Sequence, residues 1–82
     1  MSIPLFERVA LTRDLDEHGL RKGDVGVLLD YVPDPAHGEN GAVIEVFNAL
    51  GESIAVVAVR ASDIETMRAD EVLAVRRFAR SA

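Results

Sequence analysis

The sequence predicts one small domain, mainly β, with four to five antiparallel strands and a short helical turn before the last strand. Hydrophobic residues make up 49% of the 82 residues, enough for a well-packed core in so short a chain. In several short stretches apolar and polar residues alternate, which is typical of half-buried strands. Glycine, proline and acidic residues gather between these stretches, and no repeat or linker divides the chain. We therefore expect residues 1–82 to form a single domain.

The first strand is predicted over residues 7–13, where apolar and polar side chains alternate. Residues 14–23 are polar and contain two glycines, so they predict a long structured turn. Leu15 and Leu20 are the only hydrophobic residues of this turn, and we expect them to anchor it to the core.

A second strand is predicted over residues 24–32, and alternation places four of its residues on one face: Val25, Val27, Leu29 and Tyr31. Gly26 lies inside this strand, where glycine indicates a bulge or a close approach of another backbone. Residues 33–40 contain two prolines, which cannot donate to a sheet. We expect this loop to be the most mobile internal segment.

The third and fourth strands are predicted over residues 41–48 and 53–59, joined by a hairpin turn at 49–52. Residues 54–59 form an unbroken apolar run. A strand of this kind is covered on both faces, either by its own barrel or by another subunit.

A capping box is predicted at Ser62 and Glu65, which indicates one or two helical turns near residues 62–67. Residues 70–78 fit either a helix or a strand, because their apolar residues satisfy both periods. The two valines and the preceding turn favour a fifth strand, and the helical alternative stays open for residues 70–80.

The order of these elements resembles a small SH3-like barrel, with a long first loop and a helical turn before the last strand. The Gly-Asp-Val-Gly-Val-Leu stretch at residues 23–28 is similar to an element that begins a strand in KOW-type barrels. The wider pattern resembles a family of small bacterial proteins classed as a domain of unknown function. The segments that carry it are residues 9–15, 19–20, 23–26, 44–47, 54–57 and 61–64. This resemblance implies the fold, but no catalytic residues.

The charge of the chain disfavours nucleic acid and membrane surfaces as partners. Nine basic and 14 acidic residues give a formal net charge of −5, whereas phosphate-rich surfaces attract basic proteins. No stretch of about 18 apolar residues or signal peptide is present, so we expect a cytoplasmic protein. Arg76, Arg77 and Arg80 form a local basic tail. With the KOW-like element, this tail keeps an RNA- or ribosome-associated module as the alternative function.

Nothing in the sequence favours catalysis, a metal or a cofactor. The chain has no cysteine and only two histidines. Residues 14–19 imitate the start of a calcium loop, but position twelve is Val25, which has no oxygen ligand. Asp34, His37 and Glu39 share a loop without regular geometry. We therefore expect a protein that is not an enzyme, and a small active site at a subunit interface is a third reading.

The third strand indicates an interaction surface. If Ala42, Ile44 and Val46 point inward, then Val43, Glu45 and Phe47 point outward; the reverse would bury the charge of Glu45. The fourth strand is apolar on both faces. Exposed apolar surface of this kind marks an interface, unless barrel curvature and the C-terminal segment cover it. The candidate interaction residues are Val43, Glu45, Phe47, Val57 and Arg60.

These observations predict a non-enzymatic protein-interaction module that forms a homodimer or higher oligomer and binds another, unidentified protein. Phe47 is expected to anchor the interface, because buried aromatic residues carry much of the binding energy. Glu45 is expected at its rim, where Arg60 or an arginine of the C-terminal tail answers its charge.

Overall fold

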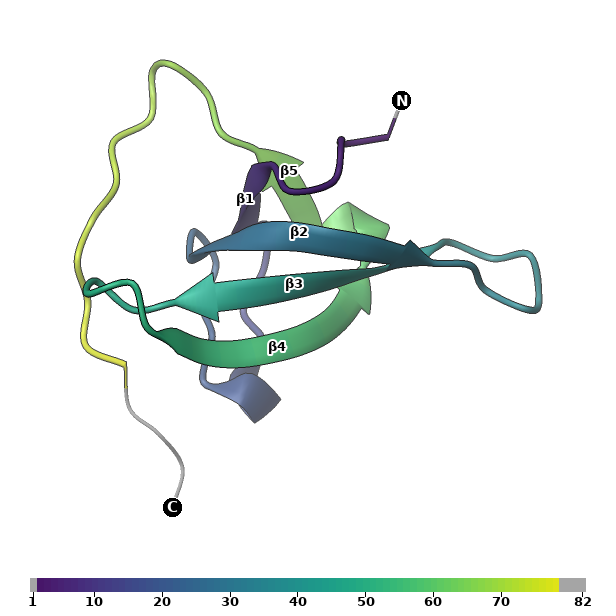
Figure 1. Cartoon of the computed structure of the whole chain (residues 1–82), viewed down its shortest axis with the longest axis horizontal. Coiled ribbons are helices and arrows are strands. Elements are labelled where there is room, and N and C mark those ends of the chain that lie inside the picture. Colours follow the sequence, from purple (N-terminus) through teal and green to yellow (C-terminus); the bar gives the residue numbers. More distant parts are fainter. Residues whose placement is uncertain (1, 79–82) are drawn as a thin grey trace.

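The structure, a computed structural model, describes residues 2–78 and contains one antiparallel sheet of five strands in the order β4-β3-β2-β1-β5. The strands β2, β3 and β4 run side by side, whereas β1 and β5 stand steeply against them (Figure 1). The sheet is not closed, because β4 and β5 form its two edges. The strands are β1 (Arg8–Leu11), β2 (Val25–Val32), β3 (Gly41–Phe47), β4 (Ser53–Arg60) and β5 (Ile64–Thr66), with 3-10 turns η1 (Asp16–His18) and η2 (Ala61–Asp63).

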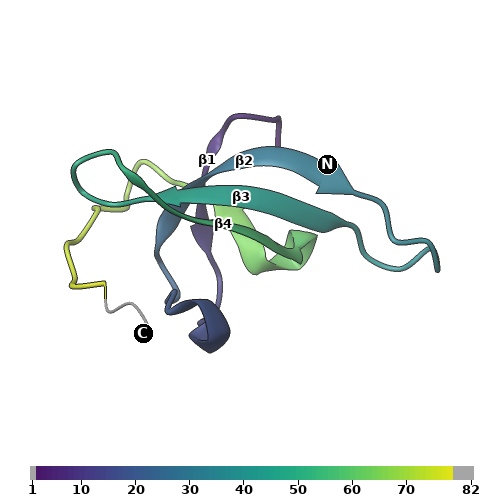
Figure 2. The same ribbon diagram turned by 60° about the horizontal axis from the view of Figure 1, so that its bottom comes forward.

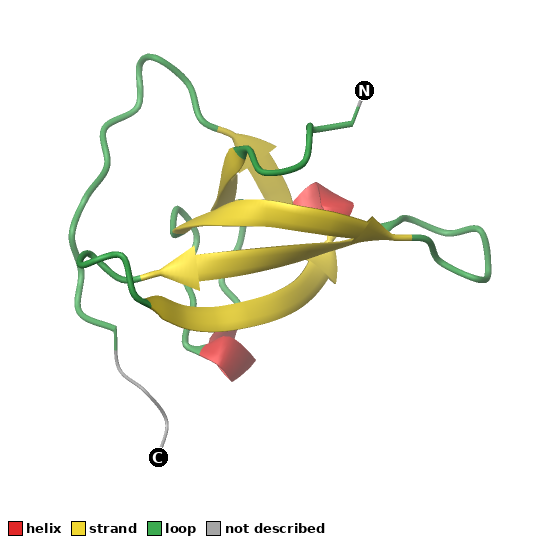
Figure 3. Ribbon diagram, in the orientation of Figure 1, coloured by secondary structure: helices red, strands yellow, loops and turns green. Residues whose placement is uncertain are grey.

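The mainly β character predicted from the sequence is confirmed (Figure 3). Strands lie in all four stretches where alternation predicts them. Their ends differ from the predicted ones by a few residues at most, because apolar alternation locates a strand better than its last hydrogen bond. The only helical elements within residues 2–78 are the two 3-10 turns.

The fifth strand is not where the sequence predicts it. Residues 70–78 have no regular secondary structure, and residues 79 and 80 lie outside the described residues. The last strand is instead β5, which pairs with β1 and places Ile64 opposite Leu11. Both side chains are buried, so β5 extends the core while it supplies hydrogen-bond partners to the outer side of β1.

The predicted capping box at Ser62 and Glu65 is also wrong. The Asp63 carboxylate accepts the Arg60 backbone N–H at 3.0 Å and thereby caps η2. Ser62 donates its amide and its hydroxyl to Glu39, at 2.9 and 3.0 Å. Because η2 ends after one turn, Glu65 falls in β5 and is exposed.

The core lies on the inner face of the curved sheet, where η1 and the long β1–β2 connection cover it (Figure 2). Leu15 and Leu20 pair with each other across this connection and are each 1% exposed, so both anchor it as predicted. The sheet supplies the other buried apolar residues: Val9, Leu11, Leu28, Ala42, Ile44, Val46, Val57, Val59 and Ile64.

The predicted single face of β2 is wrong, because a bulge at Leu29 interrupts the strand. Leu28 pairs with Ile44, whereas Asp30 pairs with Val43, so one residue of β2 has no counterpart. Alternation therefore restarts after the bulge. Tyr31 packs against the core and donates its hydroxyl to the Ile3 carbonyl at 2.8 Å. Val25 and Val27 lie on the other face of β2 from the inward-pointing Leu28.

Gly26 marks a close backbone approach, one of the two possibilities the sequence leaves open. A Cβ atom added there would lie 2.8 Å from the Glu45 carbonyl oxygen on β3. The position therefore excludes any side chain, and the bulge of β2 lies three residues further on.

Residues 67–78, named the tail here, follow β5 and return along the molecule to the β3–β4 hairpin (Figures 1 and 2). The tail contains no strand or helix. Phe78, near its end, is half-buried and packs against the core.

Candidate functional site

The face of β3 turned away from the core carries three of the predicted interaction residues. Ala42, Ile44 and Val46 are at most 3% exposed, which confirms that this set points inward. Val43 and Glu45 are half-buried on the opposite face, and Phe47 is 38% exposed at the end of the strand. This side of β2, β3 and β4 is named the outer face here.

Val57 does not belong to the outer face. It is 7% exposed and packs in the core beside Val59, so its prediction as an interface residue is wrong. The exposed apolar residues of β4 are Val56, which is 58% exposed, and Ala58. Sequence reasoning missed Val56, because a strand that is apolar at every position does not show which half points inward. Its register against β3 settles the question.

The register brings the outer-face residues together across three strands. Val27, Glu45 and Val56 form one row, and Val43 lies opposite Ala58 in β4. Glu45 thus lies between two valines and forms no ion pair within residues 2–78.

Arg60 lies away from this row. It is exposed at the end of β4, where it pairs with Gly41, whereas Glu45 pairs with Val56. Four residues of extended strand separate these positions, which corresponds to roughly 13 Å. Arg60 therefore does not answer the charge of Glu45 within one chain, although it borders the same face.

The edge of β4 that faces away from β3 is open within the described part of the chain. Ala61 donates its amide to the Asn40 carbonyl at 2.9 Å. In this register alternate residues of β4, including Val57 and Val59, point their backbone N–H and C=O groups toward β3. The backbone groups of Val56 and Ala58 then point away from the sheet. This edge has no proline or charged residue between residues 54 and 59, features that commonly protect exposed strands.

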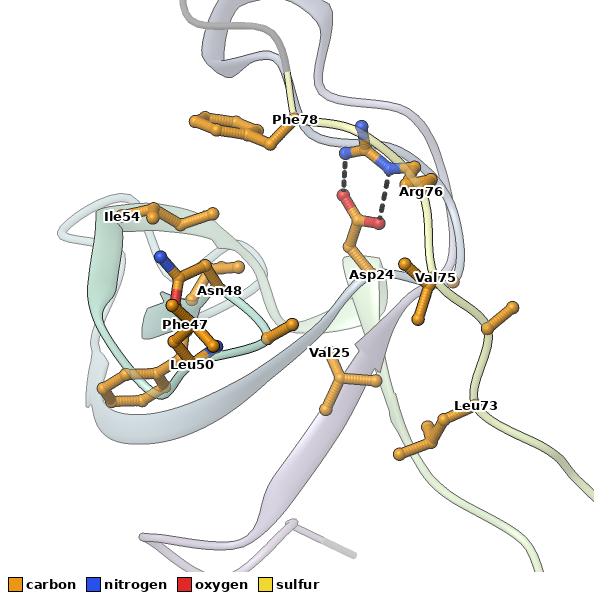
Figure 4. Close-up of a pocket in the computed structure, with 14 residues that line it drawn as sticks. Asp24, Val25, Phe47, Asn48, Leu50, Ile54, Leu73, Val75, Arg76 and Phe78 are labelled. Carbon is orange, nitrogen blue, oxygen red and sulfur yellow. Dashed lines mark hydrogen bonds and ion pairs between the residues drawn. The ribbon is translucent and has the colours of Figure 1, made fainter.

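A second feature adjoins the outer face at the β3–β4 hairpin. A pocket, named the tail groove here, lies between this hairpin, the turn before β2 and the tail (Figure 4). Its volume is about 520 Å³. Its body wall consists of Gly23, Asp24, Val25, Val46, Phe47, Asn48, Ala49, Leu50 and Ile54, and the tail contributes Leu73, Ala74, Val75, Arg76 and Phe78.

Asn48 fixes the hairpin side of this groove. Its side-chain oxygen accepts the amides of Leu50 and Glu52 at 3.0 and 2.9 Å, and its amide group donates to the Glu52 carboxylate at 2.7 Å. Gly51 has a φ of 83°, a left-handed conformation that glycine adopts without strain. The hairpin therefore holds Phe47 and Leu50 beside the groove in a defined turn.

Asp24 provides the charged group of the groove. Its carboxylate accepts the Arg21 amide at 2.8 Å and binds both Nε and Nη2 of Arg76, with Nε at 2.9 Å. The same Nη2 donates to the Gly19 carbonyl at 3.1 Å. The Asp24 and Arg76 side chains are 17% and 33% exposed, and the hydrogen bond to Asp24 raises the pKa of Arg76. The guanidinium is thus held by a two-pronged ion pair (Figure 4).

A second ion pair, between Arg13 and Asp63, has a structural role. Arg13 Nε lies 2.8 Å from Asp63 Oδ1, and Asp63 is 5% exposed. The hydrogen bond from Arg13, aided by the Arg60 amide, lowers the pKa of Asp63 although burial opposes this. Every oxygen of this carboxylate has a partner, so it joins the segment after β1 to η2 and offers no free group for chemistry.

The loops that imitate metal sites use their carboxylates internally. Asp14 accepts the Lys22 amide at 2.8 Å, and Asp34 accepts the amides of Ala36 and Gly38 at 3.0 and 3.1 Å. Within residues 2–78, no three histidine, aspartate or glutamate side chains cluster closely enough to hold a metal ion. In the same residues, no helix has the length and apolar character needed to cross a membrane.

The sequence was compared with protein families, curated proteins and solved structures. The family described as "Domain of unknown function (DUF4926)" matches residues 5–66. The chain belongs to this family. No curated protein and no solved structure matches it.

The matched region divides the tail groove. Residues 5–66 of this family include all five strands, the outer face and every body residue of the groove. The tail begins at residue 67 and lies beyond the match. The groove wall is therefore part of the family domain, and the segment seated in it is not.

Proposed function

We propose that this chain is a non-enzymatic protein-interaction module with an SH3-like barrel fold, which self-associates through the outer face and binds another protein. The strand order, the long β1–β2 connection and the 3-10 turn between β4 and β5 support the SH3-like assignment. Small barrels of this kind function through sites on their surfaces, so the function has to be argued from the surface itself.

The observation that carries the proposal is the apolar outer face beside the open edge of β4. Val56 and Phe47 are 58% and 38% exposed, and Val43, on the same strand as Phe47, is half-buried. A soluble chain of 82 residues gains little from leaving such side chains in water. Covering them would contribute roughly 25 cal/mol for each Å² of apolar surface removed from water.

A second copy related by a two-fold axis covers this face when the two outer faces pack against each other. Val56 and Phe47 of one copy then contact the apolar residues on the same face of its partner. Phe47 lies on this face near the hairpin, and Glu45 keeps one side toward water.

Sedimentation velocity over a hundredfold concentration range tests this proposal. We expect wild-type chains to associate, and Val56→Glu to abolish association because it places a charge beside Glu45. Phe47→Ala should raise the dissociation constant at least ~30-fold, since losing such an anchor costs about 2–4 kcal/mol. Val72→Glu is the matched control: Val72 is 92% exposed in the tail, so association should persist. A wild-type monomer at every concentration would refute self-association.

The alternative, an RNA- or ribosome-associated module, draws less support. Arg76 of the basic tail is engaged by Asp24, and Arg80 lies outside the described residues. Binding of a single-stranded RNA at several salt concentrations tests this reading, because phosphate contacts weaken steeply as salt rises. Tight binding with a steep salt slope would favour the alternative over the interaction module.

A further inference from the structure

The tail is attached to the body through two side chains. All hydrogen bonds between residues 67–78 and residues 2–66 come from Arg76, which binds Asp24 and the Gly19 carbonyl. Phe78 adds the contact with the core. Arg68, Asp70 and Glu71 hydrogen-bond only among themselves, in a local turn. Arg76 and Phe78 therefore act as two anchors, separated by one residue.

The tail does not fill the groove in which it lies. A pocket of about 520 Å³ remains between the tail and the hairpin. Val72 and Val75 are each 92% exposed and Leu73 is 59% exposed, so these apolar side chains gain little from their position. Leu50, on the opposite wall, is 85% exposed. The groove thus has apolar surface that its present occupant leaves in contact with water.

The groove contains hydrogen-bond acceptors that are held in position to bind an arginine side chain. The Arg21 amide holds the Asp24 carboxylate, and the Gly19 carbonyl accepts a further guanidinium hydrogen. A planar guanidinium supplies several parallel donors to such a set, whereas the ammonium group of lysine cannot match the two-pronged geometry. The site therefore selects arginine, and the neighbouring apolar wall at Ile54 suits an aromatic residue.

From these contacts we propose that the tail groove is a peptide-docking site for a partner segment that is extended and carries an arginine followed, two positions later, by an aromatic residue. Residues 72–78 are the chain's own occupant of this site, and the partner displaces them. The negative charge of Asp24 requires a positively charged residue in the partner segment. The location of the groove wall inside the family domain, with the tail outside it, agrees with a site that exists independently of the tail.

This inference rests on the proposed function in one respect, namely that the protein acts by binding another protein. Its surface adjoins the one proposed for self-association: Phe47 borders both, whereas Val56 and Ala58 do not line the groove and Asp24 does not lie on the outer face of β3 and β4. A failure of the sedimentation test would leave the groove unaffected, and a failure of the test below would leave self-association unaffected.

A peptide titration followed by NMR tests the proposal on the full chain. The probe is a synthetic peptide with the sequence of residues 70–78 and blocked ends. The receptor is the isotope-labelled full-length variant Arg76→Gln/Phe78→Ala, whose own anchors are removed. We expect the peptide to shift the amide signals of Asp24, Leu50 and Ile54, which line the groove.

Competition by the tail predicts the result for the wild-type chain. A tethered segment acts at an effective concentration of about 1 mM. If the peptide binds the variant with a dissociation constant of about 0.1 mM, the wild type should bind it about tenfold more weakly. In the labelled wild type, excess peptide should also move the Arg76 and Phe78 signals toward those of a free chain. This second measurement stands even if the double variant does not fold.

Two matched controls identify the chemistry. Asp24→Asn, introduced into the double variant, keeps an acceptor for the Arg21 amide but removes the charge, and should weaken peptide binding at least tenfold. A peptide with Arg76→Lys should bind about tenfold more weakly than the original.

Three results would overturn the proposal. The first is that excess peptide neither binds the folded variant nor displaces the tail of the wild type. The second is that Asp24→Asn leaves the affinity unchanged. The third is a wild-type dimer that Arg76→Gln dissociates, because the occupant would then be the tail of a second copy and not a separate partner.

Discussion

Replacing Gly26 by alanine should destabilise the sheet at its centre. The added Cβ would lie 2.8 Å from the Glu45 carbonyl oxygen, about 0.6 Å closer than the 3.4 Å at which ordinary contacts begin. That carbonyl belongs to a residue paired with Val27, so β2 and β3 would have to separate. Overpacking of this kind costs about 1–3 kcal/mol. Alanine also restricts the unfolded chain, which adds about 0.4–1 kcal/mol to the free energy of unfolding. We therefore expect a net decrease in the free energy of unfolding of about 1–2 kcal/mol.

Gly41→Ala is the matched control, because Gly41 also lies in a strand and also has a negative φ. Its added Cβ would meet the Val32 and Val59 carbonyl oxygens at 3.6 Å, within ordinary contact. We expect this variant to equal the wild type or to exceed its unfolding free energy by up to about 1 kcal/mol.

Urea unfolding followed by circular dichroism measures the difference at one fixed protein concentration, since association would shift the midpoints. The two variants should differ by about 2 kcal/mol, which corresponds to about 8–16 °C in thermal midpoint for a domain of this size. A Gly26→Ala protein as stable as Gly41→Ala, with equal denaturant slopes, would show that the close approach does not exist.

Further predictions concern the Asp63 cluster, the core and the 33–40 loop. Asp63→Ala should lower the free energy of unfolding by about 2 kcal/mol at neutral pH, because the Arg60 amide and the Arg13 guanidinium lose their acceptor. The folded-state pKa of Asp63 lies below its ordinary value of 3.8, so its stabilising contribution is present above that pH and is lost as the pH falls through the folded pKa. Acid titration of unfolding midpoints should therefore show a smaller loss of stability for Asp63→Asn than for the wild type. Leu28→Ala, at a position 0% exposed, should cost about 2–5 kcal/mol in thermal unfolding, whereas Leu50→Ala, at 85% exposed, should stay within about 0.5 kcal/mol. Hydrogen exchange should be faster in residues 36–40 than anywhere else between β1 and β5; slow exchange throughout that loop would contradict its predicted mobility.

The fold could be predicted where burial and sequence pattern coincide. Glu45 fixed the orientation of β3, because a carboxylate on the inner face would lose its hydration without a partner. Its neighbours Ala42, Ile44 and Val46 then had to point inward, and they do. Leu15 and Leu20 were identifiable for a related reason, since an otherwise polar turn has nothing else to bury.

Other features depend on contacts that periodicity does not contain. The bulge at Leu29 reverses the faces of β2 without any change in residue type, so alternation could not reveal it. The strand β5 is three residues long and forms because β1 offers it an unpaired edge. Ser62 and Glu65 have the spacing of a capping box, but Ser62 donates its hydrogen bonds to Glu39, 23 residues away, and not within a helix.

The candidate site also has a part that the sequence predicts and a part that it does not. The outer face of β3 followed from the charge of Glu45, whereas Val57 was placed on the wrong side of a uniformly apolar strand. The tail groove was not predicted, because its ion pair joins Arg76 to a residue 52 positions earlier. An arginine and a phenylalanine near the end of the sequence carry no local sign of such a partner.

The sheet order also has a kinetic consequence for the nascent chain. β2, β3 and β4 are joined by hairpin connections and pair with their neighbours in sequence, whereas β1 pairs with β5, which lies more than 50 residues later. Long loops close slowly, so the three-stranded meander should form first and the β1–β5 pairing last. The Asp63 contacts belong to this last step and would be absent from the transition state. Asp63→Ala should then leave the rate of folding nearly unchanged and raise the rate of unfolding. The Asp63 contacts would thus set how long the folded protein persists before it unfolds.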